Sequence, residues 1–264
     1  SLGLVGSEMC IRDSIIALVN QKGGVAKTTT AINLAASLNK KKKKVLLVDL
    51  DPQGNATSGI GVNKNETEHS IYDCLISDVP VEEVIVPTYR KGLDLLPSKV
   101  ELAGAEHELS YMEDRGTHLC NILTPVAETY DYVLIDCPPS LGMLTINALS
   151  AAEQIYVPIQ SEYYALEGVE QLMQTVSLVK QSFNPDLFVG GIIITMYDGR
   201  MRLSRDVVQT VTNTFGEVVF KTMIPRNVRL AEAPSYGKAI IDYEPLSKGG
   251  MAYNNLAKEV IKRG

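Results

Sequence analysis

Cysteine, long apolar runs and positive charge are each in short supply in this chain. The cysteines form no CxxC pair, which removes the usual support for a zinc or iron–sulfur site and suggests buried or incidental thiols in a reducing compartment. They are Cys10, Cys74, Cys120 and Cys137. No apolar run approaches the ~20 residues that a transmembrane helix needs. The formal net charge of -6 excludes a constitutive, histone-like DNA coat, although a local basic patch is compatible with it.

The remaining composition is that of an ordinary globular protein. Hydrophobic residues make up 45% of the 264 positions and charged residues 21%, and a chain of this length can bury a substantial core without disulfides or metals. Residues 1–14, SLGLVGSEMCIRDS, are too mixed and too poor in basic residues for a signal peptide. We expect them to be a non-native leader, and we expect residues 15–264 to form a single domain.

Short apolar runs alternate with helical patterns along the rest of the chain. The runs predict buried strands at Ile15–Asn20, Val45–Asp49, Val133–Asp136, Ile155–Ile159 and Val189–Thr195. The spacing of apolar residues predicts helices at Thr28–Asn39, Val100–Leu109, Gly116–Thr129, Leu141–Ala151, Leu166–Phe183, Leu203–Phe215 and Gly250–Lys262. This alternation predicts an α/β fold with a mostly parallel sheet covered by helices on both faces. The least regular stretch, Asp51–Pro97, is expected to hold mobile loops.

The segment Lys22–Thr29, KGGVAKTT, lies between a predicted strand and a predicted helix, which is the context of a phosphate-binding P-loop. Gly23 and Gly24 let backbone N–H groups turn toward phosphate oxygens, and the positive end of the following helix adds a favourable potential. Lys27 is expected to neutralise the β- and γ-phosphates of ATP. The hydroxyl of Thr28 is expected to bind Mg²⁺.

One position departs from the usual P-loop, which has glycine immediately before its last lysine. Here that position is Ala26, and because alanine can adopt helical dihedral angles we expect the loop to form. The expected ATP-binding residues of the loop are Lys22, Gly23, Gly24, Val25, Ala26, Lys27, Thr28 and Thr29.

Carboxylates close two of the predicted strands. Asp136 ends the apolar run YVLID, which is the Walker B pattern, and it is expected to hold Mg²⁺ through water. Asp49 and Asp51 lie in VDLDPQGN, where Pro52 indicates that the strand is already ending and that the two side chains diverge. One of them can then face the nucleotide while the other supports a loop. We assign Asp51 the role of positioning the attacking water.

The first lysine of the loop, Lys22, is absent from ordinary P-loops. The pattern KGGxxKTT resembles the deviant Walker A family of ParA, Soj and MinD. Further segments are similar to the ParA/Soj branch, so that the resemblance extends from about Ile15 to the end of the chain. They are VDLDPQGNATSGIG, DCPPSLGMLTINAL, SEYYALEGV, TMYDGR and IPRNVRLAEAPSYGK.

The resemblance implies an ATPase with slow basal turnover that uses ATP and Mg²⁺. It implies that ATP joins two subunits face to face and that Lys22 of each subunit reaches the phosphates of the other, where a fixed cation stabilises the transition state. It also implies nonspecific binding of duplex DNA by this dimer, a ParB-like partner that stimulates hydrolysis, and a cytoplasmic protein that associates with the nucleoid in its ATP state.

The same resemblance assigns two further sets of residues. The adenine base is expected near Pro225, Arg226 and Asn227, where a proline face and an amide can recognise a purine. DNA phosphates are expected to contact Arg200, Arg229 and Lys238, and Arg202 and Arg205 are near these residues in the sequence.

Three alternatives are kept open. The lysine run Lys40–Lys44 is either a solvated helix end or a nucleic-acid patch. A MinD-like, membrane-associated positioning ATPase would use an amphipathic C-terminal helix, but we expect the helix at Gly250–Lys262 to pack against the core, with no stable membrane association. An iron–sulfur protein like the nitrogenase iron protein would need paired cysteines, and no motif links Cys120 to Cys137.

Overall fold

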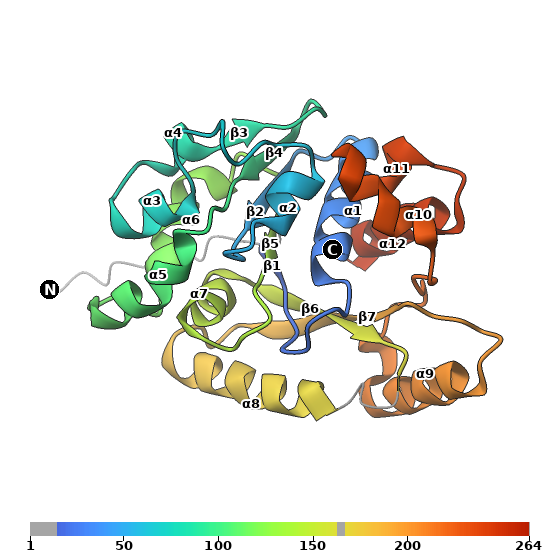
Figure 1. Cartoon of the computed structure of the whole chain (residues 1–264). Coiled ribbons are helices and arrows are strands. Elements are labelled where there is room, and N and C mark those ends of the chain that lie inside the picture. Colours follow the sequence, from blue (N-terminus) through green and yellow to red (C-terminus); the bar gives the residue numbers. More distant parts are fainter. Residues whose placement is uncertain (1–14, 163–166, 264) are drawn as a thin grey trace, which may run out of the picture.

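The computed structural model describes residues 15–162 and 167–263, and its centre is a seven-stranded sheet (Figure 1). The predicted leader with Cys10, and Leu166 at the predicted start of a helix, lie outside the described residues. The strand order is β3-β4-β2-β5-β1-β6-β7, and all neighbours are parallel except β3 and β4. The strands are β1 (Ile15–Leu18), β2 (Val45–Asp49), β3 (Val86–Pro87), β4 (Leu93–Leu96), β5 (Tyr132–Asp136), β6 (Gln154–Gln160) and β7 (Phe188–Thr195).

Helices cover both faces of the sheet (Figure 1). One face carries α1 (Lys27–Lys40), α2 (Asn55–Gly59), α10 (Val228–Glu232), α11 (Ile240–Tyr243) and α12 (Lys248–Arg263). The other carries α3 (Ile71–Ile76), α4 (Val81–Val84), α5 (Leu102–Glu108), α6 (His118–Ala127), α7 (Met143–Ala151), α8 (Glu167–Ser182) and α9 (Arg202–Phe215). Short 3₁₀ helices follow α5, α9 and α10, at Leu109–Tyr111, Gly216–Val218 and Ala233–Tyr236.

The central strand β1 explains why its sequence is apolar without interruption. Ile15 and Ala17 belong to the core on one face, whereas Ile16 and Leu18 belong to the core on the other. A strand that is covered on both sides has no polar face, so the apolar run contains no alternation. The α/β fold with helices on both faces is therefore confirmed.

The prediction for Asp51–Pro97, that it holds loops, missed the short helices and strands in this stretch. The stretch contains α2, α3, α4, β3 and β4. Strand β4, LDLL, is only four residues long and becomes buried by pairing in parallel with β2, an event that its own sequence does not indicate. Helix α3 carries a local signal that the prediction missed, a capping box between Ser70 and Asp73.

The C-terminal helix α12 packs against the core, as predicted, and its partner there is α1. The hydroxyl oxygens of Thr30 on α1 and Tyr253 on α12 lie 3.1 Å apart in the core between the two helices. The face of α12 that contains Tyr253, Leu256 and Val260 is buried. This apolar face is thus already occupied. In the parts of the chain that are described, we find no helix long and apolar enough to cross a membrane.

Candidate active site

The loop between β1 and α1 lies at the carboxyl edge of the sheet and is hydrogen-bonded to β6 and β7 (Figure 1). Asn20 donates a hydrogen bond to the carbonyl of Pro158 at 2.8 Å and accepts one from the backbone N–H of Lys22 at 2.9 Å. On the far side of the loop, the Thr195 hydroxyl donates to the carbonyl of Val25 at 3.0 Å. These bonds fix both ends of the loop against the sheet. Sequence reasoning missed Asn20 and Thr195, because neither belongs to the phosphate-loop pattern.

Two residues of the loop have left-handed backbone. Gly24 has φ +75°, which suits glycine, and nothing lies within 4 Å of the position where a Cβ would stand. Ala26 has φ 68° and ψ 34°, just before α1 begins. The expectation of ordinary helical dihedral angles at Ala26 is therefore corrected: the loop forms, but alanine occupies a conformation that costs about 1–2 kcal/mol relative to right-handed backbone.

Lys27 is the first residue of α1 and is buried at the sheet edge. Its ammonium donates to the carbonyl of Lys22 at 3.3 Å, across the loop. Burial lowers the pKa of Lys27, and the nearby Asp136, Cys137 and Asp51 partly offset this shift. The structure thus brings a lysine and two carboxylates of the predicted site together.

Asp136 ends β5 and lies opposite Asp49 in the register of β2 and β5, and both side chains are fully buried. Burial, followed by the charge of Asp49, raises the pKa of Asp136 well above its ordinary value, and Thr28 and Lys27 offset part of this shift. Neither carboxylate oxygen has a hydrogen bond of normal geometry. A buried carboxylate without a partner is costly, and a cation held between Asp136 and Thr28 would satisfy it. The residues present therefore fit Mg²⁺.

Asp49, the last residue of β2, and Asp51 have different main hydrogen-bond partners, although the N–H of Asp51 also donates to the Asp49 carboxylate at 3.3 Å. Asp49 accepts hydrogen bonds from the backbone N–H and the hydroxyl of Thr57, both at 2.7 Å, and so supports the turn into α2. Burial raises the pKa of Asp49 to about 6. Asp51 lies beyond the strand end and accepts from the N–H of Gln53 at 2.9 Å. Its role in positioning water stays a prediction.

Lys22 is partly exposed, and its ammonium lies 4.0 Å from the Glu162 carboxylate. The same carboxylate lies 3.6 Å from the guanidinium of Arg226. Glu162 thus connects the first lysine of the loop with the predicted base segment. The prediction did not assign it a role, although it belongs to the string SEYYALEGV. Residues 163–166 of that string lie outside the described chain.

The predicted base segment joins the end of β7. Pro225 forms an isolated bridge with Tyr197, and the N–H of Arg226 donates to the Tyr197 carbonyl at 3.2 Å. The side-chain oxygen of Asn227 accepts from the N–H of Arg229 at 2.8 Å and caps α10. Because the oxygen of Asn227 is engaged in this cap, its amide nitrogen remains as the donor for a bound base.

The two predicted DNA-contacting arginines are paired with acidic residues. Arg200 donates to both carboxylate oxygens of Asp198, at 2.9 and 2.6 Å. Arg229 contacts Glu232 at 2.8 Å and Glu244 at 2.9 Å. The third predicted residue, Lys238, is exposed. The sequence did not indicate these ion pairs, and they partly neutralise the surface that is expected to bind phosphates.

The cysteines give no support to an iron–sulfur centre. Cys74 and Cys137 are buried, and burial raises the pKa of both thiols, to about 12 for Cys74. Among residues 15–162 and 167–263, no group of three or more His, Cys, Asp or Glu side chains could hold a metal ion. Cys137 is instead a neighbour of Lys27 and Asp136 beneath the phosphate loop.

Comparisons with known proteins agree with this geometry. A family model described as an AAA domain matches residues 13–189. The sporulation initiation inhibitor protein Soj of Bacillus subtilis is 52% identical over 95% of this chain and 99% of its own. The chromosome-partitioning ATPase Soj of Thermus thermophilus is 53% identical over 94% and 95%. A crystal structure of Mycobacterium smegmatis cobyrinic acid a,c-diamide synthase with an ATP analogue and magnesium has a TM-score of 0.83 and 39% identity, and covers 94% of both chains.

The parallel sheet, the phosphate loop and the unpartnered carboxylate at its edge define a P-loop ATPase, a class whose cofactors are ATP and Mg²⁺. Within that class, the sequence identity of about half with the two Soj proteins, over nearly the full length of each, determines the family. The chain belongs to the Soj/ParA family of chromosome-partitioning ATPases.

Proposed function

We propose that this ATPase works as a switch in DNA segregation, in which ATP joins two subunits and the resulting dimer binds duplex DNA without sequence preference. The observation that carries the proposal is the pair of unpartnered Asp136 oxygens in a buried position near Lys27 and Thr28. Such a carboxylate is ready to receive a cation, and the neighbouring loop is ready to receive phosphates.

Each residue of the site then has a chemical role. Lys27 leaves the Lys22 carbonyl and neutralises phosphate oxygens, and the backbone N–H groups of the loop bind them. Thr28 directly, and Asp136 through water, would hold Mg²⁺, which would neutralise charge on the phosphates. Asp51 orients the water that attacks the γ-phosphate, so that the products are ADP and phosphate.

Lys22 acts in the partner subunit. Its side chain is 38% exposed, and its ion pair with Glu162 is long at 4.0 Å, so little energy holds the ammonium in its own subunit. Two subunits that face each other with bound ATP repel one another, and a lysine from each subunit against the other's γ-phosphate offsets that repulsion. When hydrolysis removes the γ-phosphate, the dimer opens.

DNA phosphates contact Arg200, Arg229 and Lys238. In one subunit the arginines are neutralised by nearby carboxylates, which is in keeping with weak binding by the single subunit. A dimer presents two such surfaces to one duplex, and the avidity of the pair couples ATP binding to DNA binding. A ParB-like partner then stimulates hydrolysis and releases the ATPase from the nucleoid. The buried apolar face of α12 argues against a membrane-bound alternative.

The test is DNA binding by the purified protein without nucleotide and with ADP, ATP or a nonhydrolysable ATP analogue, at two salt concentrations. We expect binding to DNA of unrelated sequences only with ATP or the analogue, and weaker binding at the higher salt concentration, because phosphate contacts release counterions. Absence of binding in all states would overturn the DNA proposal, and co-sedimentation with liposomes would then test the membrane alternative.

A further inference from the structure

Part of the lysine run Lys40–Lys44 forms a cluster of cations at the end of α1. The cluster consists of Lys40, Lys41, Lys42, Lys91 and Lys258, all of which are exposed except for the half-buried Lys41. The phosphate loop precedes α1 and the lysines follow it, so the 14-residue helix separates the two by about 20 Å. The lysine cluster is therefore distinct from the nucleotide site, because the two lie at opposite ends of α1, which Figure 1 labels.

Contacts between α1 and α12 bring these lysines together. The ammonium of Lys41 donates to the side-chain oxygen of Asn254 on α12 at 2.8 Å. Lys258 lies one helical turn after Asn254, on the same side of α12. Burial lowers the pKa of Lys41, and the positive charges of Lys258 and Lys40 lower it further. The fold thus holds like charges close to one another, at a cost in stability.

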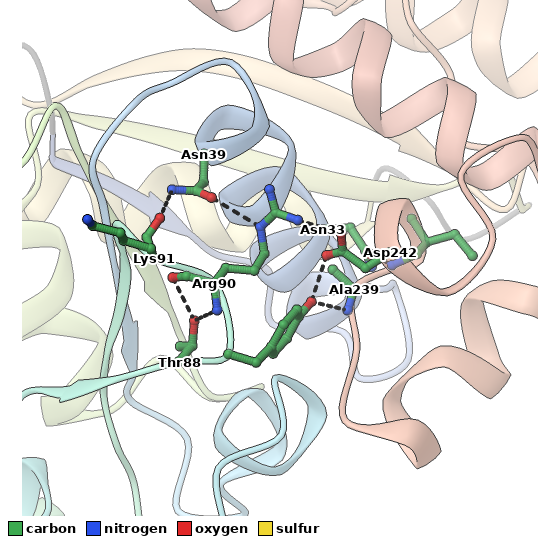
Figure 2. Close-up of polar contacts among 9 residues, drawn as sticks. Asn33, Asn39, Thr88, Arg90, Lys91, Ala239 and Asp242 are labelled. Atoms are coloured by element: carbon green, nitrogen blue, oxygen red, sulfur yellow. Dashed lines mark hydrogen bonds and ion pairs between the residues drawn. The ribbon is translucent and has the colours of Figure 1, made fainter.

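A network of polar contacts places Lys91 beside the end of α1 (Figure 2). Asn39, at the end of α1, donates to the carbonyl of Lys91 at 3.2 Å and accepts from Arg90 at 3.1 Å. Arg90 and Tyr89 in turn contact the carboxylate of Asp242 on α11. Arg90 is consequently neutralised, whereas the ammonium of Lys91 points away from the network in Figure 2.

The cluster differs from the other cations of this region in lacking counter-charges. Lys43 is paired with Asp131 at 3.3 Å, and the ammonium of Lys44 lies over the ring of Tyr130, 4.6 Å from its centroid. For the part of the chain that is described, no carboxylate lies within ion-pair distance of the lysine cluster. The predicted DNA-contacting arginines, in contrast, are paired. In a chain of net charge -6, such a concentration of unpaired cations fits a polyanion.

We propose that the lysine cluster is a second contact surface for the phosphate backbone of duplex DNA. This inference rests on the proposed DNA binding and adds a surface to it. A face-to-face dimer joined at its nucleotide sites leaves the opposite end of α1 open to solvent in both subunits. Flexible lysines bind phosphates as point charges, without a requirement for sequence.

The experiment compares two double variants that remove equal charge. The first, Lys40→Gln with Lys42→Gln, keeps Lys41 and its bond to Asn254. The control, Lys221→Gln with Lys248→Gln, removes two exposed lysines outside the cluster. Binding of a random-sequence duplex is measured by fluorescence anisotropy with the nonhydrolysable ATP analogue over a series of salt concentrations. Vesicles containing phosphatidylglycerol serve as a second anionic probe.

For the first variant we expect DNA affinity to fall about tenfold, and the slope of log affinity against log salt to become shallower by about one for each lost phosphate contact. The control is expected to change affinity less than about twofold. The thermal unfolding midpoint of the first variant should equal or exceed that of the parent chain, because repulsion is relieved. A fall in affinity with a stable fold supports the proposal.

Three outcomes would overturn it. If the parent chain binds no DNA in any nucleotide state, the proposed DNA function fails together with this inference. If the parent binds DNA and the two variants bind equally well, only the lysine surface fails. If the first variant loses binding to anionic vesicles but retains its affinity for DNA, the cluster is a lipid-binding surface.

Discussion

The carboxylates of Asp49 and Asp136 lie opposite one another on adjacent parallel strands, both fully buried. Asp49 is satisfied by Thr57, whereas Asp136 has no hydrogen bond of normal geometry. Burial, and then the proximity of the Asp49 charge, raises the pKa of Asp136. The site is therefore destabilising until a cation binds, a pattern expected where a protein gives up stability for function.

Replacement of Asp136 by asparagine should show this conflict directly. At neutral pH we expect Asp136→Asn to stabilise the nucleotide-free chain by about 1–3 kcal/mol, because a buried and unpartnered charge is removed. The same variant should lose the stabilisation that Mg²⁺ and ATP give to the parent chain. Urea denaturation with and without Mg²⁺ and ATP measures both effects. A destabilised nucleotide-free variant would contradict the expectation.

The raised pKa values also predict the pH dependence of stability. Between the ordinary pKa of an aspartate, about 4, and the raised value of about 6 for Asp49, the folded chain retains a proton that the unfolded chain has released. Stability of the nucleotide-free chain attributable to this pair should therefore fall as pH rises through that window. The advantage of Asp136→Asn should shrink as pH is lowered, because protonation neutralises Asp136 in the parent chain. Urea midpoints at several pH values test this, and an advantage that does not vary with pH would refute it.

Ala26 offers a test of backbone strain in the phosphate loop. Glycine at this position removes the cost of left-handed backbone, about 1–2 kcal/mol, which favours the folded state. Glycine also raises the conformational entropy of the unfolded chain, which favours unfolding by about 0.4–1 kcal/mol. We expect Ala26→Gly to stabilise the chain by about 0.5–1 kcal/mol in urea denaturation. Ala31→Gly, in the interior of α1, is the matched control and should destabilise by about 1 kcal/mol. Loss of stability in both variants would show that the left-handed conformation of Ala26 carries no strain.

Removal of Lys22 should separate nucleotide binding from dimer formation. We expect Lys22→Ala to lose ATP-dependent dimerisation while it retains part of its nucleotide affinity, because Lys27 and the loop backbone remain. Sedimentation with a nonhydrolysable ATP analogue measures the dimer, and a nucleotide titration measures the affinity. Lys248→Ala, at an exposed lysine outside the site, is the control. Unchanged dimerisation of Lys22→Ala would count against the shared site.

Substitution of an arginine and substitution of its acidic partner should change DNA affinity in opposite directions. Arg200→Ala and Arg229→Ala should weaken DNA binding equally for all sequences, since they contact phosphates. Arg200 lowers the pKa of Asp198 to about 2, so that Asp198 stays charged and competes with phosphate. Asp198→Asn should therefore strengthen DNA binding severalfold. Anisotropy with two unrelated duplexes checks both expectations, and a sequence-selective loss would contradict the assignment to phosphate contacts.

The sequence by itself predicted the parts of this protein whose signals are local. The apolar run at Ile15–Leu18, the loop at Lys22–Thr29 and the helix after it follow one another along the chain, and their periodicity and glycines were sufficient to predict them. The position of Asp136 at the end of a strand could be predicted because the apolar run and its terminal carboxylate are adjacent in the sequence. The same holds for the end of β2, which Pro52 indicated correctly.

The tertiary structure decided what depends on partners distant in the sequence. Strand β4 becomes buried only by pairing with β2. The pKa of Asp136 is raised by its burial in the core and then by the charge of Asp49, which the pairing of β2 with β5 places opposite it, 87 positions earlier in the chain. The lysine run splits into paired and unpaired members. Lys43 is paired because Asp131, just before β5, lies beside it, whereas Lys41 lies near a further cation, Lys258 of α12. Local sequence specifies backbone conformation, but burial and electrostatic partners arise from the packing of remote segments, and a local pattern does not encode them.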